Sequence, residues 1–320
     1  MKKIVKQTLG LLLLAPFLPV AELAAQSLIG FGPDAAKKQL ALEATFDKQL
    51  QAKNLRDWMK RMSAYPHQVG SKFGLENALF IRDQLNTWGF DARLDTVHVL
   101  FPTPKVRILE MTEPTKFKAL LTEKAVKEDA TSSQTKDVLP PYHAFSANGD
   151  VTAELVFVNY GLPEDYEELA RLGVSVKGKI VIAKYGNSWR GIKPKVAHEN
   201  GALGCIIYSD PKEDGFFQGD VYPKGPFKND AGAQRGSVVD LPYAPGDPLT
   251  NGFVAGPDQK RLTVDEAPSM MKIPVLPISY ALTQSNWWTS CARSVERGFT
   301  HYLPCGPRTS QSTLKTGIQF

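Results

Sequence analysis

The chain has 320 residues, of which 42% are hydrophobic and 22% are charged, and its formal net charge is +5. These values are ordinary for a globular protein and leave room for about two domains. Lysines and arginines are scattered, with no dense basic stripe alternating with aromatic residues, so we expect no nucleic-acid partner.

Residues 1–25 are typical of a cleaved export signal. Lysines among the first six residues precede the apolar run 9–20, and the small residues at 23–25 offer a cleavage site. The alternative is a membrane anchor, but the run is shorter than the roughly 20 residues that span a bilayer. Pro16 and Pro19 also interrupt it. The sequence therefore predicts a signal peptide, a secreted or periplasmic location, and no membrane span in the mature chain.

The next part of the chain favours helices followed by a strand. Residues 36–62 mix polar and apolar residues as a helix does, and 61–71 is rich in turn residues. Residues 74–90 carry apolar side chains at helical spacing and reach a natural stop at Gly89. Residues 92–101 alternate between apolar and polar side chains, which predicts a strand.

Beyond Pro102 the pattern changes to strands that alternate with short helices. The predicted strands are 154–160, 177–186, 202–211 and 272–280, and the predicted helices are 163–173 and one beginning at 194–200. Residues 123–137 are charged and rich in Ser and Thr, which predicts an exposed loop. Residues 214–250 are rich in Gly and Pro, and a loop of this length is usually functional or part of an interface. This order predicts a mixed α/β or α+β domain between about 104 and 280.

Residue types that support catalysis are present but lack catalytic spacing. The five histidines match neither a His-Glu-x-x-His motif nor a Cys/His zinc pattern, so we interpret them as turn, strand or surface residues: His67, His98, His143, His198 and His301. Glu167 and Glu168 are neighbours on a predicted helix and point in different directions, which indicates a solvated face. No Gly-x-Ser-x-Gly elbow or phosphate-binding loop occurs.

The three cysteines cannot all pair within one chain. Cys205 lies in the apolar run "ALGCIIY", which predicts a buried and unreactive thiol. Cys291 and Cys305 could form a disulfide in an oxidising compartment, which the sequence does not decide.

Arg190 stands out because it lies in a turn between two predicted buried segments, next to Trp189 and Gly191. A guanidinium can bind a carboxylate with two parallel hydrogen bonds, and the helix that follows would present its positive end. The alternative is a surface arginine paired with a nearby Asp or Glu, and the pattern alone favours this alternative.

Several long stretches resemble the glutamate carboxypeptidase II family of secreted and membrane-tethered zinc peptidases, to which transferrin receptor is also related. They cover about 36–280 and occur in the family's order: "PHQVGS", "WGFDARLDTVHVLFPTPKVRILE", "GDVTAELVFVNYGLPEDYEEL", "KGKIVIAKYGNSWRGIKPKVA", "GCIIYSDP", "QRGSVVDLPYAPGDPLTNG" and "IPVLPISY".

The resemblance implies a domain plan. Residues 26–101 correspond to an N-terminal helical segment of a zinc aminopeptidase-like domain. Residues 102–280 correspond to a protease-associated (PA) domain, a β-sandwich or barrel-like sheet with flanking helices, inserted after it. In the family, the dizinc peptidase domain and a helical dimerisation domain follow, and their zinc-ligand motifs do not occur in this sequence. We therefore expect a truncated relative without zinc or catalytic residues of its own, inactive alone, whose partners are an acidic peptide carboxylate and the missing peptidase domain.

Four positions match functional residues of the family. Arg190 corresponds to the arginine that holds the substrate's terminal carboxylate. Ser237 falls where the glutamate-releasing enzyme has a substrate-contacting Asn. Thr250 and Phe253 correspond to residues whose backbone carbonyls bind a structural calcium. The other calcium ligands belong to the family's later region, so we expect no calcium here.

Residues 281–320 depart from the family's continuation. The pair Trp287-Trp288 fixes the bases TGGTGG, and reading one base earlier gives NTG-GTG, commonly Leu-Val, which fits the expected Leu-rich helix. We therefore predict an aberrant, frameshifted tail, the alternative being a divergent natural one. Two other functions stay open: a non-catalytic receptor-like binding module and a nonfunctional gene product.

Overall fold

The computed structural model describes residues 28–113, 116–134, 136–281 and the strand 313–319. The chain divides into two compact units, 1–62 and 63–320. The predicted signal peptide, His301, the Trp287-Trp288 pair and the cysteines Cys291 and Cys305 lie outside the described residues. In the described part of the chain, we find no helix with the length and apolar character to cross a membrane.

The described part of the first unit contains two helices, where the sequence suggested one helical segment. Helix α1 spans Pro33–Gln49 and α2 spans Ala52–Met62. Pro33 suits the first helical turn because its missing N–H would have no partner there. The helices are separate because Leu50 adopts an extended backbone conformation, with φ of −68° and ψ of 114°.

The second unit begins with the predicted helix and an extended segment. Helix α3 (Lys72–Thr87) is capped by Ser71, whose Oγ accepts a hydrogen bond from the Gly74 N–H at 3.1 Å. The strand predicted at 92–101 is wrong, since these residues belong to no sheet. They lie against an irregular loop and not against another strand: the His98 N–H donates to the carbonyl of Ala255 in that loop, at 2.9 Å.

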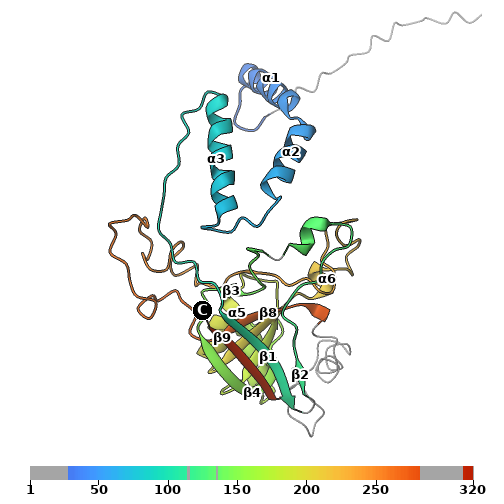
Figure 1. Cartoon of the computed structure of the whole chain (residues 1–320), viewed down its shortest axis with the longest axis vertical. Coiled ribbons are helices and arrows are strands. Elements are labelled where there is room, and N and C mark those ends of the chain that lie inside the picture. The colour runs from blue at the N-terminus through green and yellow to red at the C-terminus, as the bar shows by residue number, and fades with distance from the viewer. Residues whose placement is uncertain (1–27, 114–115, 135, 282–312, 320) are drawn as a thin grey trace, which may run out of the picture. The chain divides into compact units, whose positions relative to one another are not determined.

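A seven-stranded sheet forms the centre of the second unit (Figure 1). Its strands in spatial order are β2 (Phe117–Lys118), β1 (Val106–Glu113), β9 (Thr313–Gln319), β4 (Gly149–Phe157), β5 (Ile180–Lys184), β6 (Gly204–Tyr208) and β8 (Val275–Ile278). Strands β4, β5, β6 and β8 run parallel, whereas β1 is antiparallel to β2 and β9, and β9 is antiparallel to β4.

Shorter elements complete the unit. They are the parallel pair β3 (His143–Ala144) and β7 (Gly236–Ser237), the helices α4 (Pro163–Arg171), α5 (Ile192–Glu199) and α6 (Pro211–Asp214), and a 3-10 turn at Ala130–Ser133.

Strand β9 comes from the segment that the sequence set apart as a tail. It lies between β1 and β4 in Figure 1 and pairs with both. The frameshift concerns the nucleotide sequence and stays a prediction, as does the domain boundary at 101/102.

Both faces of the sheet are buried, and the side chains of β5 alternate between them. Val181 and Ala183 belong to a cluster that includes side chains of α4 and α5. Ile180 and Ile182 belong to a second cluster, which also holds Leu109 of β1 and Ile278 of β8. Strands β1 and β8 are far apart in the strand order, so this second core extends across much of the sheet. The predicted mixed α/β class, with a barrel-like sheet and flanking helices, is confirmed.

Replacing Asp165 with alanine is expected to lower the free energy of unfolding by about 2 kcal/mol. Its buried carboxylate accepts the Leu162 N–H at 3.0 Å and the Asn159 side-chain amide at 2.9 Å, which closes the first turn of α4. Urea denaturation monitored by circular dichroism measures the change. The exposed neighbour Glu164 provides the control substitution to alanine, and equal effects of the two changes would contradict the capping role.

Candidate functional site

The turn between β5 and α5 presents Arg190. Strand β5 ends at Lys184, and the chain reverses through Gly186 (φ +106°) and Asn187 (φ +58°) before α5 starts. Positive φ favours glycine and tolerates asparagine, which explains both residues. The N–H of Lys193 donates to the carbonyl of Arg190 at 3.3 Å, so Arg190 lies at the very start of the helix.

Gly191 is required in this turn by close packing. A Cβ at this position would lie 2.6 Å from Trp189 Nε1 and 2.6 Å from the Val238 carbonyl oxygen. The backbone of 238–239 therefore packs directly against the turn, and the indole of Trp189 closes the other side.

The guanidinium of Arg190 has only neutral acceptors among the described residues. Its Nη1 donates to the carbonyl of Ser237 and its Nη2 to Oε1 of Gln234, each at 3.3 Å. Within the described part of the chain, no carboxylate lies within ion-pair distance of Arg190. The alternative of an arginine paired with a neighbouring Asp or Glu therefore has no support in these residues.

Arg190 lines a cavity of about 470 Å³. The other lining residues come from the β5–α5 turn, the start of α6 and the segment before β7: Tyr185, Gly186, Ser188, Trp189, Asp210, Glu213, Asp214, Gln234, Ser237 and Leu241. Two donors of the lining residues, Arg190 Nε and Trp189 Nε1, are buried and have no hydrogen-bond partner among the described residues. Unpaired buried donors are costly.

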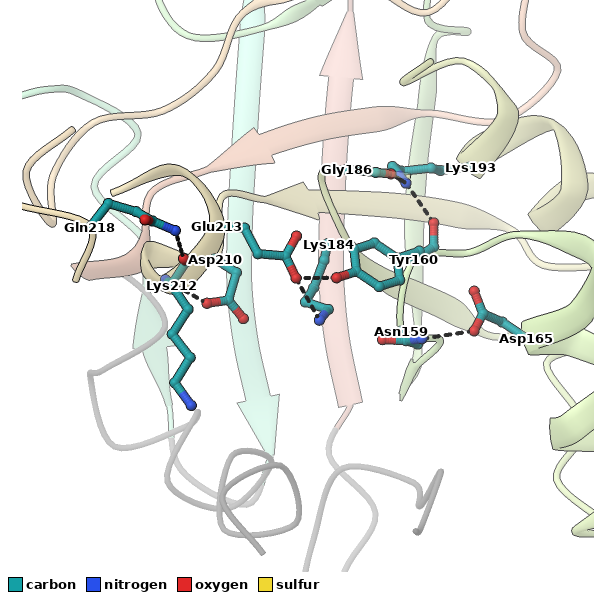
Figure 2. Close-up of polar contacts among 10 residues, drawn as sticks. All are labelled: Asn159, Tyr160, Asp165, Lys184, Gly186, Lys193, Asp210, Lys212, Glu213 and Gln218. Carbon is teal, nitrogen blue, oxygen red and sulfur yellow. Dashed lines mark hydrogen bonds and ion pairs between the residues drawn. The ribbon is translucent and has the colours of Figure 1, made fainter. Parts of the chain in front are cut away.

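Two of the three acidic side chains in the cavity wall form ion pairs with lysines. Glu213 pairs with Lys184, whose Nζ lies 3.3 Å from Oε1, and the Tyr160 hydroxyl donates to the same oxygen (Figure 2). Burial, followed by the contact with Glu213, raises the pKa of Tyr160 well above its usual range, so this hydroxyl stays protonated. Asp214 pairs with Lys228.

Lys193 fixes the turn from inside the protein. Its side chain is fully buried, and Nζ donates to the carbonyls of Tyr160 at 2.6 Å and Gly186 at 3.0 Å (Figure 2). Burial lowers the pKa of this lysine from 10.5 to about 8. The sequence analysis did not single out Lys193, because nothing in "IKPK" distinguishes a buried lysine from an exposed one.

The PA domain family matches residues 151–247. A protein of Arthroderma benhamiae named "Probable glutamate carboxypeptidase" is 42% identical over 179 residues, which are 54% of this chain and 24% of the relative. The "Glutamate carboxypeptidase 2 homolog" of Caenorhabditis elegans is 29% identical over 252 residues, 72% of this chain and 31% of the relative. The chain contains a PA domain and is related to these glutamate carboxypeptidases.

The likeness extends to other members and covers part of their length. The mouse protein "Aminopeptidase NAALADL1" is 28% identical over 264 residues, 77% of this chain and 34% of its own length. A solved structure, an aminopeptidase from Aneurinibacillus sp. strain AM-1, aligns with 85% of this chain and 44% of its own at 18% identity and a TM-score of 0.41. The chain spans a quarter to a third of the length of the three curated relatives.

Two of the four residues that the family resemblance indicated lie together. Arg190 and Ser237 are in contact in this PA domain, but through the Ser237 carbonyl, while the Ser237 hydroxyl accepts the Val239 N–H at 3.1 Å. Thr250 and Phe253 lie in a separate turn, where the Thr250 carbonyl accepts the Phe253 N–H at 3.2 Å. Their proposed calcium role stays a prediction.

The described residues do not offer a zinc site. Among them, no three His, Cys, Asp or Glu side chains group closely enough to hold a metal ion. Cys205 is buried as predicted, and burial raises the pKa of its thiol to about 12, which makes the thiolate rare at neutral pH. Glu168 pairs with Arg171 on α4 and Glu167 is exposed, in agreement with a solvated helix face.

Proposed function

We propose that the cavity at Arg190 binds the terminal carboxylate of a peptide. The observation that carries the proposal is a guanidinium without a carboxylate partner among the described residues, in the wall of a cavity. A planar guanidinium is the side chain best suited to bind a carboxylate, because two N–H groups can reach both oxygens.

The family relation supports a peptide with an acidic C-terminal residue, as in the glutamate carboxypeptidases named above. In a peptidase of this kind, a clamp on the terminal carboxylate would fix the distance between that end and the scissile bond, which reduces the entropy cost of reaching the reactive geometry. The described residues of this chain do not fit a zinc site, so we assign them the binding and orienting part only.

Replacing Arg190 with lysine is expected to weaken binding of aspartyl-glutamate at least about tenfold, because an ammonium cannot reproduce the two-pronged contact. Isothermal titration calorimetry on the full chain measures the dissociation constant. Arg171→Lys, on the outer face of α4, is the matched control and should bind as the wild type does.

The same dipeptide with a C-terminal amide tests whether binding depends on the terminal carboxylate of the ligand. It lacks the terminal carboxylate and is expected to bind the wild type as weakly as aspartyl-glutamate binds the Arg190→Lys variant. Equal affinity of the acid and the amide, or an unchanged Arg190→Lys variant, would refute carboxylate binding at this cavity.

The remaining parts of the functional prediction belong to the same proposal. We propose an exported protein that needs a dizinc peptidase domain on a separate polypeptide for hydrolysis. Metal analysis of the purified chain together with a glutamate-release assay tests this: two tightly held zinc ions with turnover would overturn it. A defined protein partner without turnover would favour the receptor-like module, and aggregation would favour a nonfunctional product.

A further inference from the structure

The guanidinium of Arg190 rests on one short segment, residues 234–237. Its Nη2 and Nη1 donate to this segment, to the side chain of Gln234 and the carbonyl of Ser237, and the Tyr185 hydroxyl also contacts the guanidinium directly. Between them lies Gly236, with φ of +146°, where a Cβ would come within 2.4 Å of Arg190 Nη1. The guanidinium therefore packs against bare backbone, and the position of this segment helps to determine where Arg190 points.

The strand pairing of this segment is minimal. Strand β7 contributes only Gly236 and Ser237, which pair with His143 and Ala144 of β3. A two-stranded ladder of this length is at best marginally stable. Side chains from elsewhere must therefore supply much of the hold on residues 234–237.

Two buried side chains contact the segment's carbonyls. The Tyr185 hydroxyl lies 3.0 Å from the carbonyl oxygen of Gln234, and His143 Nδ1 lies 3.2 Å from that of Gly236. The two side chains also contact each other, with Tyr185 Oη 2.9 Å from His143 Nε2. Tyr185 directly follows β5, and its N–H donates to the carbonyl of Tyr208 in β6 at 2.9 Å, so the pair links the segment to the central sheet.

The protons of this pair can be placed from the acceptors. A carbonyl only accepts, so the contact with Gly236 places the hydrogen on His143 Nδ1. Burial lowers the pKa of His143 to about 3, so the ring is neutral near pH 7 and Nε2 accepts from Tyr185. The single hydroxyl proton of Tyr185 is shared between Nε2 and the Gln234 carbonyl. Removing this one oxygen therefore disrupts two contacts.

We propose that His143 and Tyr185 are positioning residues for Arg190, which hold residues 234–237 so that the guanidinium faces the cavity. The functional meaning of this role rests on the proposed carboxylate binding. The positions of His143, Tyr185, Arg190 and residues 234–237 do not depend on a ligand, so this role can be tested without one.

The test compares Tyr185→Phe with Tyr166→Phe in the full chain. Tyr166 is the matched control, because its hydroxyl is also buried but has no hydrogen-bond partner among the described residues and lies on α4. The first readout is the rate at which phenylglyoxal modifies Arg190, followed by peptide mass spectrometry. We expect this rate to rise about fivefold in Tyr185→Phe, which corresponds to the loss of one net hydrogen bond, and to stay at the wild-type value in Tyr166→Phe.

The second readout is the dissociation constant for aspartyl-glutamate, expected to rise about fivefold in Tyr185→Phe only. An unchanged rate of Arg190 modification would overturn the positioning role, whatever the affinity. A faster modification without any binding of the dipeptide by the wild type would support the positioning role and refute the proposed function instead.

A second variant covers the case in which Tyr185→Phe does not fold. His143→Asn keeps an amide donor near the place of Nδ1 and loses the contact of Nε2 with Tyr185. It should raise the modification rate of Arg190 less than Tyr185→Phe does, and a rate equal to that of the wild type would count against the proposal.

Discussion

Replacing Gly191 with alanine is expected to lower the free energy of unfolding by about 3 kcal/mol. The added methyl group would meet Trp189 Nε1 and the Val238 carbonyl oxygen at 2.6 Å and the Val239 carbonyl oxygen at 2.9 Å. Two of these atoms belong to backbone, which moves only if the segment directly after β7 shifts. The φ of Gly191 is −68°, which alanine adopts freely, so the loss comes from overpacking and not from backbone strain.

Urea denaturation measures this change, and titration with aspartyl-glutamate shows whether the neighbouring Arg190 has moved with the turn. Gly256→Ala is the control, because a Cβ there has no atom within 4 Å. It should change the free energy of unfolding by less than about 0.5 kcal/mol. A similarly small effect of Gly191→Ala would mean that the turn is not packed as described.

Relative to Lys193→Met, the wild type is expected to gain about 3 kcal/mol in its free energy of unfolding between pH 7 and pH 10.5. The pKa of Lys193 is about 8 in the folded protein against 10.5 for a free lysine. Between these two values the unfolded chain binds more protons than the folded chain, so the wild type gains stability as the pH rises. Methionine has no proton to lose and cannot follow this gain.

Denaturation curves at pH 7, 8, 9 and 10.5 for both proteins provide the measurement. Below pH 8 the wild type carries a buried charge that two carbonyls, of Tyr160 and Gly186, stabilise in part. Lys212→Met is the control, since that lysine is exposed at the start of α6 (Figure 2). If the difference between the wild type and Lys193→Met changed with pH no more than the difference for Lys212→Met, this would contradict the buried lysine.

The two predictions concern the same turn from opposite sides. Gly191 allows the backbone of 238–239 to approach, and Lys193 holds the carbonyl of Gly186 at the other end. In the sequence, Arg190 lies between Gly186 and Gly191. The turn is therefore anchored on both sides of Arg190, which favours a fixed position for a residue that binds one end of a ligand.

Local patterns were sufficient for the elements around the site. The apolar runs at β5 and β6 predicted buried strands, and the segment of β8 predicted an extended one. The spacing of apolar residues predicted α3, and Pro163 and Gly173 marked the ends of α4. These signals depend on neighbours a few residues apart. The place of Arg190 followed from the same reasoning: the run that forms β5 stops at Gly186, and the next helix starts at 192. The family resemblance then indicated a ligand for Arg190, the terminal carboxylate of a peptide substrate.

Long-range pairing was beyond such patterns. Strand β9 pairs with β1 and β4, which lie more than 150 residues earlier in the chain, and neither β1 nor β9 was predicted. Conversely, residues 92–101 alternate as a strand should, yet meet an irregular loop in place of a strand edge. A strand exists only where a partner offers unpaired backbone groups, and the partner's position is a property of the whole fold.

The sequence by itself determined that a turn with an arginine separates two buried strands, and that the motifs around it are those of a PA domain. Only the tertiary structure decided what surrounds that arginine. It placed neutral acceptors from 234–237 beside Arg190, and it buried Lys193 while Lys195, two residues on, pairs with Asp240. The reason is physical: charge and hydrogen-bond partners depend on distances across the fold, and segments distant in sequence set those distances only when the chain has packed.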